Sequence, residues 1–154
     1  MKIAHSVNIR VFCGEEENES GVIGGLKFLL PLDLEKEKIE ITKQTAFGFS
    51  DRKISIFEVV LVKNGHIKAF LENLLTKISA TDKQMLLRQL DSRIDDDANF
   101  FIRFEKEILV KHRELLVTDS GNCYHVRIKV ASFPSTKKAA MAVMEKVLVE
   151  SLNK

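Results

Sequence analysis

The chain has 154 residues, of which 45% are hydrophobic and 30% are charged, and its formal net charge is +2. This length and composition suit a chain that buries its own core, so residues 1–154 are predicted to form a single domain. With 7 glycines and 2 prolines, the sequence has little room for low-complexity disorder. It holds no apolar run near the ~18–20 residues that span a bilayer and no signal-peptide pattern, so we expect a cytoplasmic protein without membrane contact.

Charge is distributed unevenly along the chain. Residues 1–40 carry 5 basic and 8 acidic side chains, giving −3, and residues 69–99 carry 4 and 6, giving −2. In contrast, residues 41–68 carry 5 and 2, giving +3, and residues 100–154 carry 10 and 6, giving +4. Because binding follows the local potential, a nearly neutral protein can still present a basic surface where the positive segments meet.

The first predicted strand, residues 3–13, has a period of two in hydrophobicity. Its odd positions form the face expected to be buried, and they are Ile3, His5, Val7, Ile9, Val11 and Cys13. The acidic stretch 15–19 favours the start of a helix, which should stop at Pro31. Gly24 and Gly25 lower helix propensity and therefore predict a close approach of this helix to the sheet.

Two strands are predicted next, over residues 38–45 and 53–63. We expect the second to be buried on both faces, because apolar residues occupy both parities. Asn64 is predicted to cap the following helix, and Thr81 with Gln84 forms a capping box for another helix that reaches about Arg93. The helix after Asn64 has an apolar stripe at the i, i+3, i+4, i+7 spacing, made of Ile67, Phe70, Leu71, Leu74, Leu75 and Ile78.

Three further strands are predicted over residues 100–105, 114–117 and 123–133, with residues 107–113 left open between helix and strand. A turn over residues 118–122 precedes the last strand. The final helix starts after Pro134 and has a stripe made of Ala140, Val143, Met144, Val147, Leu148 and Leu152. This order of elements predicts an α+β fold, with helices packed on one face of a mostly antiparallel sheet.

The sequence carries no recognised catalytic or metal-binding motif. The histidines His5, His66, His112 and His125 fall on separate elements, and the two cysteines, Cys13 and Cys123, lie on separate strands. Residues 95–97 are consecutive aspartates, which favour a solvated turn over a magnesium site. We therefore expect no catalytic residues, no metal, no cofactor and no disulfide.

Strand parity predicts that the uncovered sheet face is basic. It turns five basic side chains outward, beside Ser6, Asn8 and Phe101, and these five are Arg10, Arg103, His125, Arg127 and Lys129. Guanidinium and ammonium groups bind phosphates, and exposed aromatic rings stack on unpaired bases, so this face suits RNA. The competing interpretation is the ordinary solvated face of an antiparallel sheet. The signatures of RRM, KH and zinc-knuckle modules are missing.

Four stretches, taken in order, resemble an archaeal family of predicted RNA-binding, exosome-associated proteins. They are LLPLDL at 29–34, LVKNGHIKAFL at 61–71, NFFIRF at 99–104 and LVTDSGNC at 116–123. The resemblance implies a fold similar to ribosomal protein L5, RNA as the ligand and exosome subunits as partners. Within these stretches, Lys63, His66 and Lys68 form a polar cluster that we add to the candidate RNA contacts.

Two functions follow from the sequence. The first is a non-catalytic RNA-binding protein, an accessory to the archaeal RNA-degrading exosome, that contacts phosphates through the basic sheet face. The alternative is a protein-interaction or dimerisation module that forms a homodimer or binds another protein and does not bind nucleic acid. A continuous positive stripe through Arg10, Arg103, Arg127 and Lys129 favours the first, whereas an exposed apolar patch favours the second.

Overall fold

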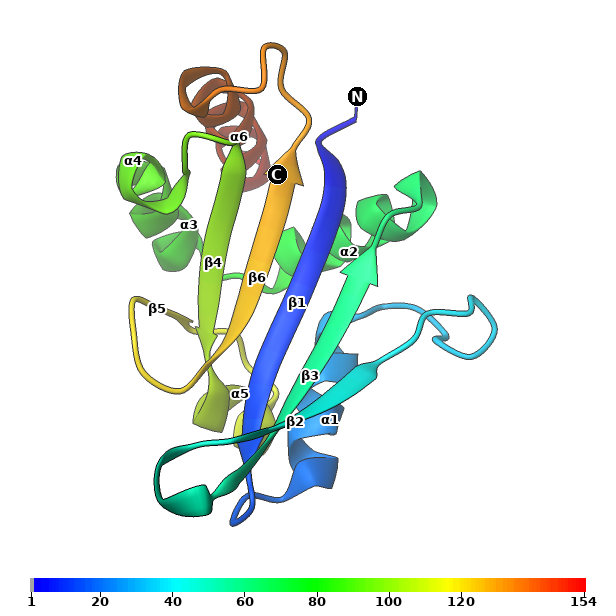
Figure 1. The fold of residues 1–154 in the computed structure, drawn as a ribbon. Helices are drawn as coiled ribbons and strands as arrows, with labels where there is room; N and C mark the ends of the chain where they lie inside the picture. Colours follow the sequence, from blue (N-terminus) through cyan, green and yellow to red (C-terminus); the bar gives the residue numbers. More distant parts are fainter. Residues whose placement is uncertain (1) are drawn as a thin grey trace.

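The strands of the computed structural model, which describes residues 2–154, form one antiparallel sheet. Met1, the first residue of the predicted domain, lies outside the described residues. The six strands are β1 (Ala4–Gly14), β2 (Thr42–Phe47), β3 (Lys53–Leu61), β4 (Asn99–Glu105), β5 (Val117–Thr118) and β6 (Cys123–Val130). Their order across the sheet is β2-β3-β1-β6-β4-β5, so the strand nearest the N-terminus lies near the centre (Figure 1).

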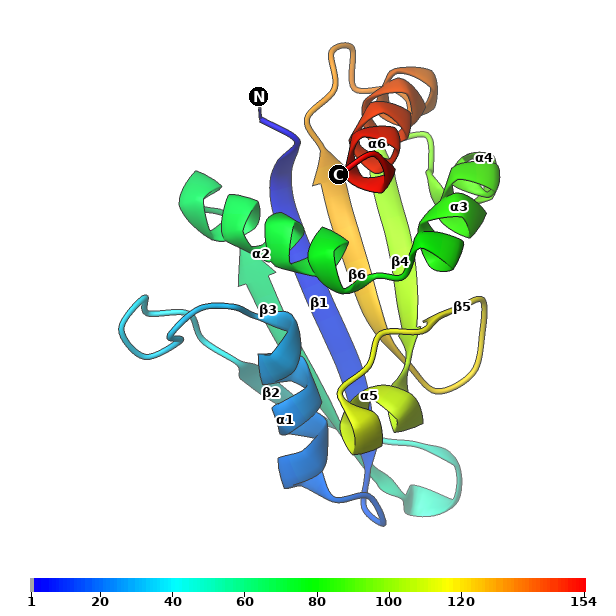
Figure 2. The ribbon, with the colours of Figure 1, turned by 180° about the vertical axis from the view of Figure 1, so that it is seen from behind.

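The helices lie on one side of this sheet and confirm the predicted α+β arrangement. They are α1 (Glu19–Leu29), α2 (Asn64–Lys77), α3 (Ala80–Arg88), α4 (Leu90–Arg93), α5 (Lys106–His112) and α6 (Lys137–Leu152), with a short 3-10 turn η1 (Phe49–Asp51) between β2 and β3. Figure 2 shows α1, α2, α5 and α6 in front of the strands, whereas the view in Figure 1 looks onto β1, β6 and β4 with no α-helix in front of them. The region left open in the prediction, 107–113, is therefore mostly helix.

Strand β1 alternates as predicted, except at its start. Val7, Ile9 and Val11 are fully buried against the helices. The predicted burial of His5 is wrong, because the pairing with β6 shifts register between Ala4 and Ser6. This irregularity reverses the parity, so that Ala4 is buried and His5 is exposed.

Strand β3 is buried on one face only, which corrects the prediction of burial on both. Phe57 and Leu61 lie in the core, whereas Val60 and Val62 are 50% and 65% exposed. The reason is that helices cover a single face of the sheet. The other strand limits also differ: the predicted strand 38–45 begins only at Thr42, and the predicted 114–117 is reduced to the two residues of β5. Strand β6 ends at Val130 instead of at residue 133.

Two of the predicted helix caps are also wrong. Helix α2 starts one residue earlier than predicted: Lys63 occupies the N-cap position without a side-chain cap, and Asn64 is the first helical residue. Helix α3 is capped by Ser79, whose hydroxyl accepts a hydrogen bond from the Asp82 backbone N–H at 3.1 Å, and not by Thr81. This earlier start orients the buried Asp82 carboxylate toward β5, where it accepts a hydrogen bond from the Val117 backbone N–H at 3.0 Å.

The apolar stripes of α2 and α6 were predicted well. In α2 the buried residues are Ile67, Phe70, Leu71 and Leu74, and in α6 they are Ala140, Met144, Val147 and Leu148. Leu75 is only half-buried. The helices therefore pack on the sheet through the faces that their spacing indicates.

The close approach predicted for the two glycines of α1 is found at Gly25. A Cβ atom there would lie 2.2 Å from the Tyr124 hydroxyl of β6, which donates a hydrogen bond to the Val22 carbonyl at 2.7 Å. At Gly24, a Cβ atom would instead meet the end of the flexible Arg113 side chain at 2.5 Å. The glycine at position 25 therefore makes room for a buried tyrosine, whereas the neighbour at 24 has no comparable constraint.

We expect Gly25→Ala to lower the free energy of unfolding by about 1–3 kcal/mol, because the new methyl group overlaps a side chain that cannot move without losing its buried hydrogen bond. Gly24→Ala is the matched control. It should be neutral or stabilising by up to about 1 kcal/mol through higher helix propensity. Urea unfolding of both variants checks the pair, and equal effects would contradict the close-packing argument.

Candidate nucleic-acid interface

The uncovered face of β1, β6 and β4 carries basic side chains in three adjacent cross-strand rows. In the first row Arg10, His125 and Arg103 lie opposite one another. The second row aligns Asn8, Arg127 and Phe101, and the third aligns Ser6, Lys129 and Asn99. Directly opposed residues in a sheet have Cβ atoms about 4.5–5.5 Å apart, so the rows form one continuous surface. We call this surface, with Arg10, Arg103, His125, Arg127 and Lys129, the basic face.

Hydrogen bonds to backbone carbonyls orient two of these cations. The Arg103 Nη1 atom donates to the Asp119 carbonyl at 2.9 Å, and the Lys129 ammonium donates to the Asp97 carbonyl. The Asp119 carboxylate is itself held by the buried Arg93 at 2.6 Å. Within residues 2–154, the exposed side chains of Arg10 and Arg127 form no ion pair. Glu58 of β3 lies opposite Arg10 at the margin of the basic face but forms no ion pair with it, so the face keeps cationic groups free for a ligand.

Two phenylalanines lie among these charges. Phe101 is 37% exposed and lies opposite Arg127, and Phe12 is 42% exposed at the end of β1. The Arg10 guanidinium carbon lies 5.7 Å from the centre of the Phe12 ring, and the His125 ring meets the same ring edge-on with centroids 6.2 Å apart. Aromatic rings held in this way beside cations can stack on bases while neighbouring groups contact phosphates.

The structure also brings a cysteine next to a histidine on the basic face, a contact that is not among the sequence predictions. The Cys123 Sγ and His125 Nε2 atoms are 3.4 Å apart. The i, i+2 spacing on one strand was the available signal, since such residues share a face. Burial raises the pKa of the Cys123 thiol and, together with Arg103 and Arg10, lowers the pKa of the His125 imidazole. Both shifts favour the neutral pair over the thiolate that nucleophilic catalysis requires.

Because the pKa of His125 is lowered in the native state, we expect the stability of the protein to depend on pH. The unfolded chain takes up a proton near pH 6.5, whereas the native state resists it, so the unfolded state binds more protons below that pH. The free energy of unfolding should therefore fall as the pH drops below about 6.5. We expect His125→Gln to reduce this fall, measured by urea unfolding at several pH values. The exposed His112→Gln variant is the control, and identical pH profiles for wild type and His125→Gln would contradict the assignment.

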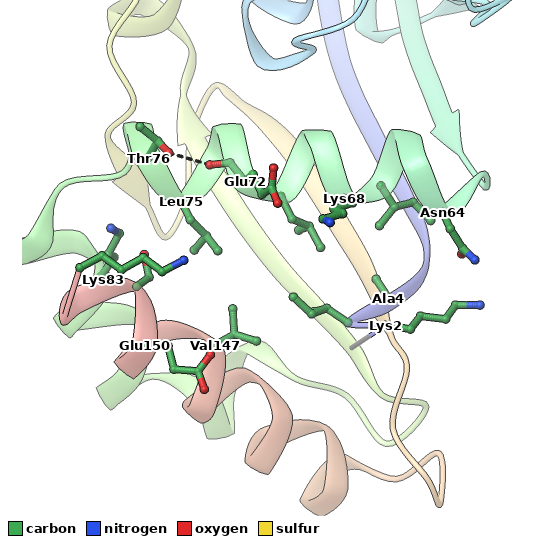
Figure 3. Close-up of a pocket in the computed structure, with 15 residues that line it drawn as sticks. Lys2, Ala4, Asn64, Lys68, Glu72, Leu75, Thr76, Lys83, Val147 and Glu150 are labelled. Carbon is green, nitrogen blue, oxygen red and sulfur yellow. Dashed lines mark hydrogen bonds between the residues drawn. The ribbon is translucent and has the colours of Figure 1, made fainter.

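The second predicted cluster lies away from the basic face. Lys63 is exposed at the junction between β3 and α2, and the His66 Nε2 atom lies 3.9 Å from a Glu37 carboxylate oxygen. Lys68 lies along a groove between α2 and α6, on the helix side of the sheet (Figure 3). The structure therefore assembles five of the eight predicted RNA contacts and separates these three from them.

The aspartates at 95–97 form the predicted turn. One Asp95 carboxylate oxygen accepts hydrogen bonds from the backbone N–H groups of Asp97 and Asn99, at 3.0 and 2.9 Å. Across residues 2–154, no group of three or more His, Cys, Asp or Glu side chains has the arrangement of a metal site. Likewise, among the helices of this described part, none combines the length and apolar character needed to cross a membrane.

Comparison with known proteins identifies the family. Residues 6–132 match the model of the family RNA_binding, described as RNA binding, and this match covers most of the chain. The chain belongs to this RNA-binding family. The RNA-binding protein PAB1135 of Pyrococcus abyssi is 28% identical over 145 residues, which cover 94% of this chain and 94% of that protein.

Solved structures of other proteins share the fold of this family member. The protein AF2318 from Archaeglobus fulgidus superimposes with a TM-score of 0.82 at 24% identity, over 95% of this chain and 99% of that one. Mth689, a DUF54 protein from Methanothermobacter thermautotrophicus, gives a TM-score of 0.78 at 20% identity, over 95% and 98%. At these identities the likeness concerns the fold alone.

Proposed function

We propose that this member of the RNA-binding family is a single-domain, non-catalytic protein that contacts RNA phosphates through the basic face. The observation that carries the proposal is the register of β1, β6 and β4, which aligns Arg10, Arg127 and Lys129 in successive rows. Guanidinium and ammonium groups spaced along adjacent rows can contact successive phosphates of one strand. Membership of the RNA-binding family and the name of the Pyrococcus abyssi relative support RNA as the ligand.

The aromatic residues favour unpaired RNA over duplex. Phe12 and Phe101 are partly exposed beside Arg10 and Arg127. An unstacked base can therefore pack on an aromatic ring while the neighbouring cation contacts its phosphate. Sequence-specific and single-strand recognition of RNA commonly uses such stacking, whereas duplex RNA hides its base faces. The RNA on the basic face is therefore proposed to be single-stranded.

Salt dependence tests the proposal with the wild-type protein. Each phosphate contact to single-stranded RNA should contribute a log–log salt slope of about −0.7, because counterions are released on binding. Contacts by Arg103, Arg127 and Lys129 should together give a slope near −2. Fluorescence anisotropy with a labelled oligouridylate, over a series of salt concentrations, measures this slope. If the wild-type protein shows no affinity for the oligouridylate at low salt, the proposal is wrong.

Further features of the proposal rest on the family resemblance. They are a fold similar to ribosomal protein L5, a cytoplasmic location and an accessory role at the archaeal RNA-degrading exosome. Co-sedimentation of the purified protein with reconstituted exosome, with and without RNA, tests the last of these. If variants of the basic face keep full RNA affinity, Lys63, His66 and Lys68 are the next candidate contacts.

The alternative function is a protein-interaction or dimerisation module, and one observation favours it. Val60 is exposed on the uncovered face of β3, opposite Asn8 and beside the basic rows, and Val62 is exposed just after this strand. Exposed apolar side chains in a cluster are typical of protein interfaces. Sedimentation of the protein alone distinguishes this function, because a homodimer through β3 should form without RNA and dissociate in Val60→Lys.

A further inference from the structure

A groove with an apolar floor lies on the helix side of the sheet, between α2 and α6. It has a volume of about 880 Å³, which is within the size range of ligand-binding pockets. Figure 3 shows α2 on one side, α6 on the other and the start of β1 at one end. Its apolar lining comes from Ile3, Ile67, Leu71, Leu75 and Val147. The groove is thus separated from the basic face by the thickness of the sheet.

One buried lysine reaches this groove from α3. Lys83 is only 8% exposed, and it forms no ion pair or hydrogen bond through Nζ with another residue in the described chain 2–154. In that same part of the chain, every fully enclosed side-chain nitrogen or oxygen has a hydrogen-bond partner. The Lys83 ammonium must therefore touch solvent, and the side chain extends into the groove (Figure 3).

The stem of Lys83 is buried, so its ammonium is held at the groove surface, and no carboxylate of residues 2–154 pairs with it. A carboxylate from outside the chain would supply the missing partner through a charge-assisted hydrogen bond. The buried side chain thus indicates that the groove is built for an anionic group, beyond what its shape alone suggests.

The charges around the groove decide what kind of anion it takes. Lys2, Lys68 and Lys154 lie at the groove together with Glu72 and Glu150, so lysines outnumber carboxylates once Lys83 is included. The excess of lysine favours an anion, but an apolar floor offers nothing to the phosphate backbone of a polyanion such as RNA. A ligand with one carboxylate and several apolar groups satisfies both the lysine and the floor.

We propose that this groove docks an amphipathic acidic segment of a partner protein. A glutamate or aspartate of the segment pairs with Lys83, and its leucine-like side chains cover the floor formed by Leu71, Leu75 and Val147. Docking of this kind matches the recognition of amphipathic helices in hydrophobic grooves. Since the groove and the basic face lie on opposite sides of the sheet, the protein can hold this segment and RNA at once. The inference does not depend on the proposed RNA function.

Selection of short random peptides displayed on phage against the full chain tests the proposal. Selected sequences should be enriched in acidic residues flanked by leucine, isoleucine or phenylalanine. Their synthetic forms should bind Lys83→Met about tenfold or more weakly, because one charge-assisted pair is lost. Lys146→Met, an exposed lysine of α6 outside the groove, is the matched control and should bind as wild type does.

Two further measurements keep the test independent of folding. Lys68→Glu changes an exposed residue of the groove and should also weaken the acidic peptide. Replacing the peptide's acidic residue by its amide should weaken binding to wild type but not further weaken binding to Lys83→Met, as expected for one shared pair. Affinity of Lys83→Met for oligouridylate should stay unchanged.

Three outcomes would overturn the inference. The first is a selection without binders or without acidic enrichment, and the second is binding that is indifferent to both Lys83→Met and Lys68→Glu. The third is that oligouridylate competes with the peptide for the wild-type protein but not for Lys83→Met. That result would assign the groove to RNA. A failure of wild-type RNA binding at the basic face would leave the peptide result standing, so the two proposals fail separately.

Discussion

Replacing Arg127 and Lys129 together by alanine should make the log–log salt slope of RNA binding less negative by about 1 to 1.5. The two residues occupy neighbouring rows of β6, opposite Asn8 and Ser6 of β1. Each contributes a phosphate contact in the proposed complex, and both substitutions remove charge from the uncovered face without touching the core. The affinity at low salt should fall with the slope, because the same counterion release drives both.

The thermal stability of this double variant should stay nearly unchanged, since substitutions at solvent-facing strand positions have small effects. Lys27→Ala with Lys146→Ala, two exposed lysines on α1 and α6, is the matched control for loss of the same charge. It should leave the slope as in wild type. An unchanged slope in the β6 variant would move the RNA site away from the basic face.

The largest expected effect on folding comes from Leu74→Ala in α2. Leu74 is 1% exposed and lies in the core between this helix and the sheet. Its truncation removes buried apolar surface and leaves a cavity, which together should lower the free energy of unfolding by about 2–5 kcal/mol. Leu75→Ala, on the same helix but half-buried, should cost clearly less. Urea unfolding compares the two, and equal losses would contradict the packing of α2 through its predicted stripe.

Strand periodicity was sufficient to predict the basic face. Residues 8, 10, 127 and 129 fall outward because a strand alternates strictly and helices cover one side only. The same rule placed His5 on the wrong face, because the register shift between Ala4 and Ser6 leaves no mark in the residue pattern. Such a register shift depends on how β1 pairs with β6. The residues of β1 alone therefore do not reveal it.

Helix starts were harder to predict than helix faces. Asn64 and Thr81 are good capping residues, yet the backbone enters the helices at Lys63 and Ser79. At Ser79 the choice follows from tertiary structure, since the earlier start positions the Asp82 carboxylate to bind the backbone of β5. Cap propensity is a weak preference that such a buried hydrogen bond outweighs.

The groove and the cysteine–histidine contact could not have been predicted in the same way. The groove combines α2, α3, α6 and the start of β1, four segments whose proximity arises only from the assembled fold. In the sequence Lys83 is an ordinary polar position near the start of a helix, and only the fold shows that α6 packs against that helix. The positions of charged residues in the sequence do not locate a binding site. The packing of the fold is needed to show which cations lack a partner.

Chemical-shift mapping of the isotope-labelled protein with a short oligouridylate tests the central claim most directly, because it reports which residues sense the RNA. We expect shifts at the backbone amides around Arg10, Phe101 and Arg127, on the three strands of the basic face, with those of α2 and α6 unmoved. Shifts confined to the helix side, or none at saturating RNA, would contradict it.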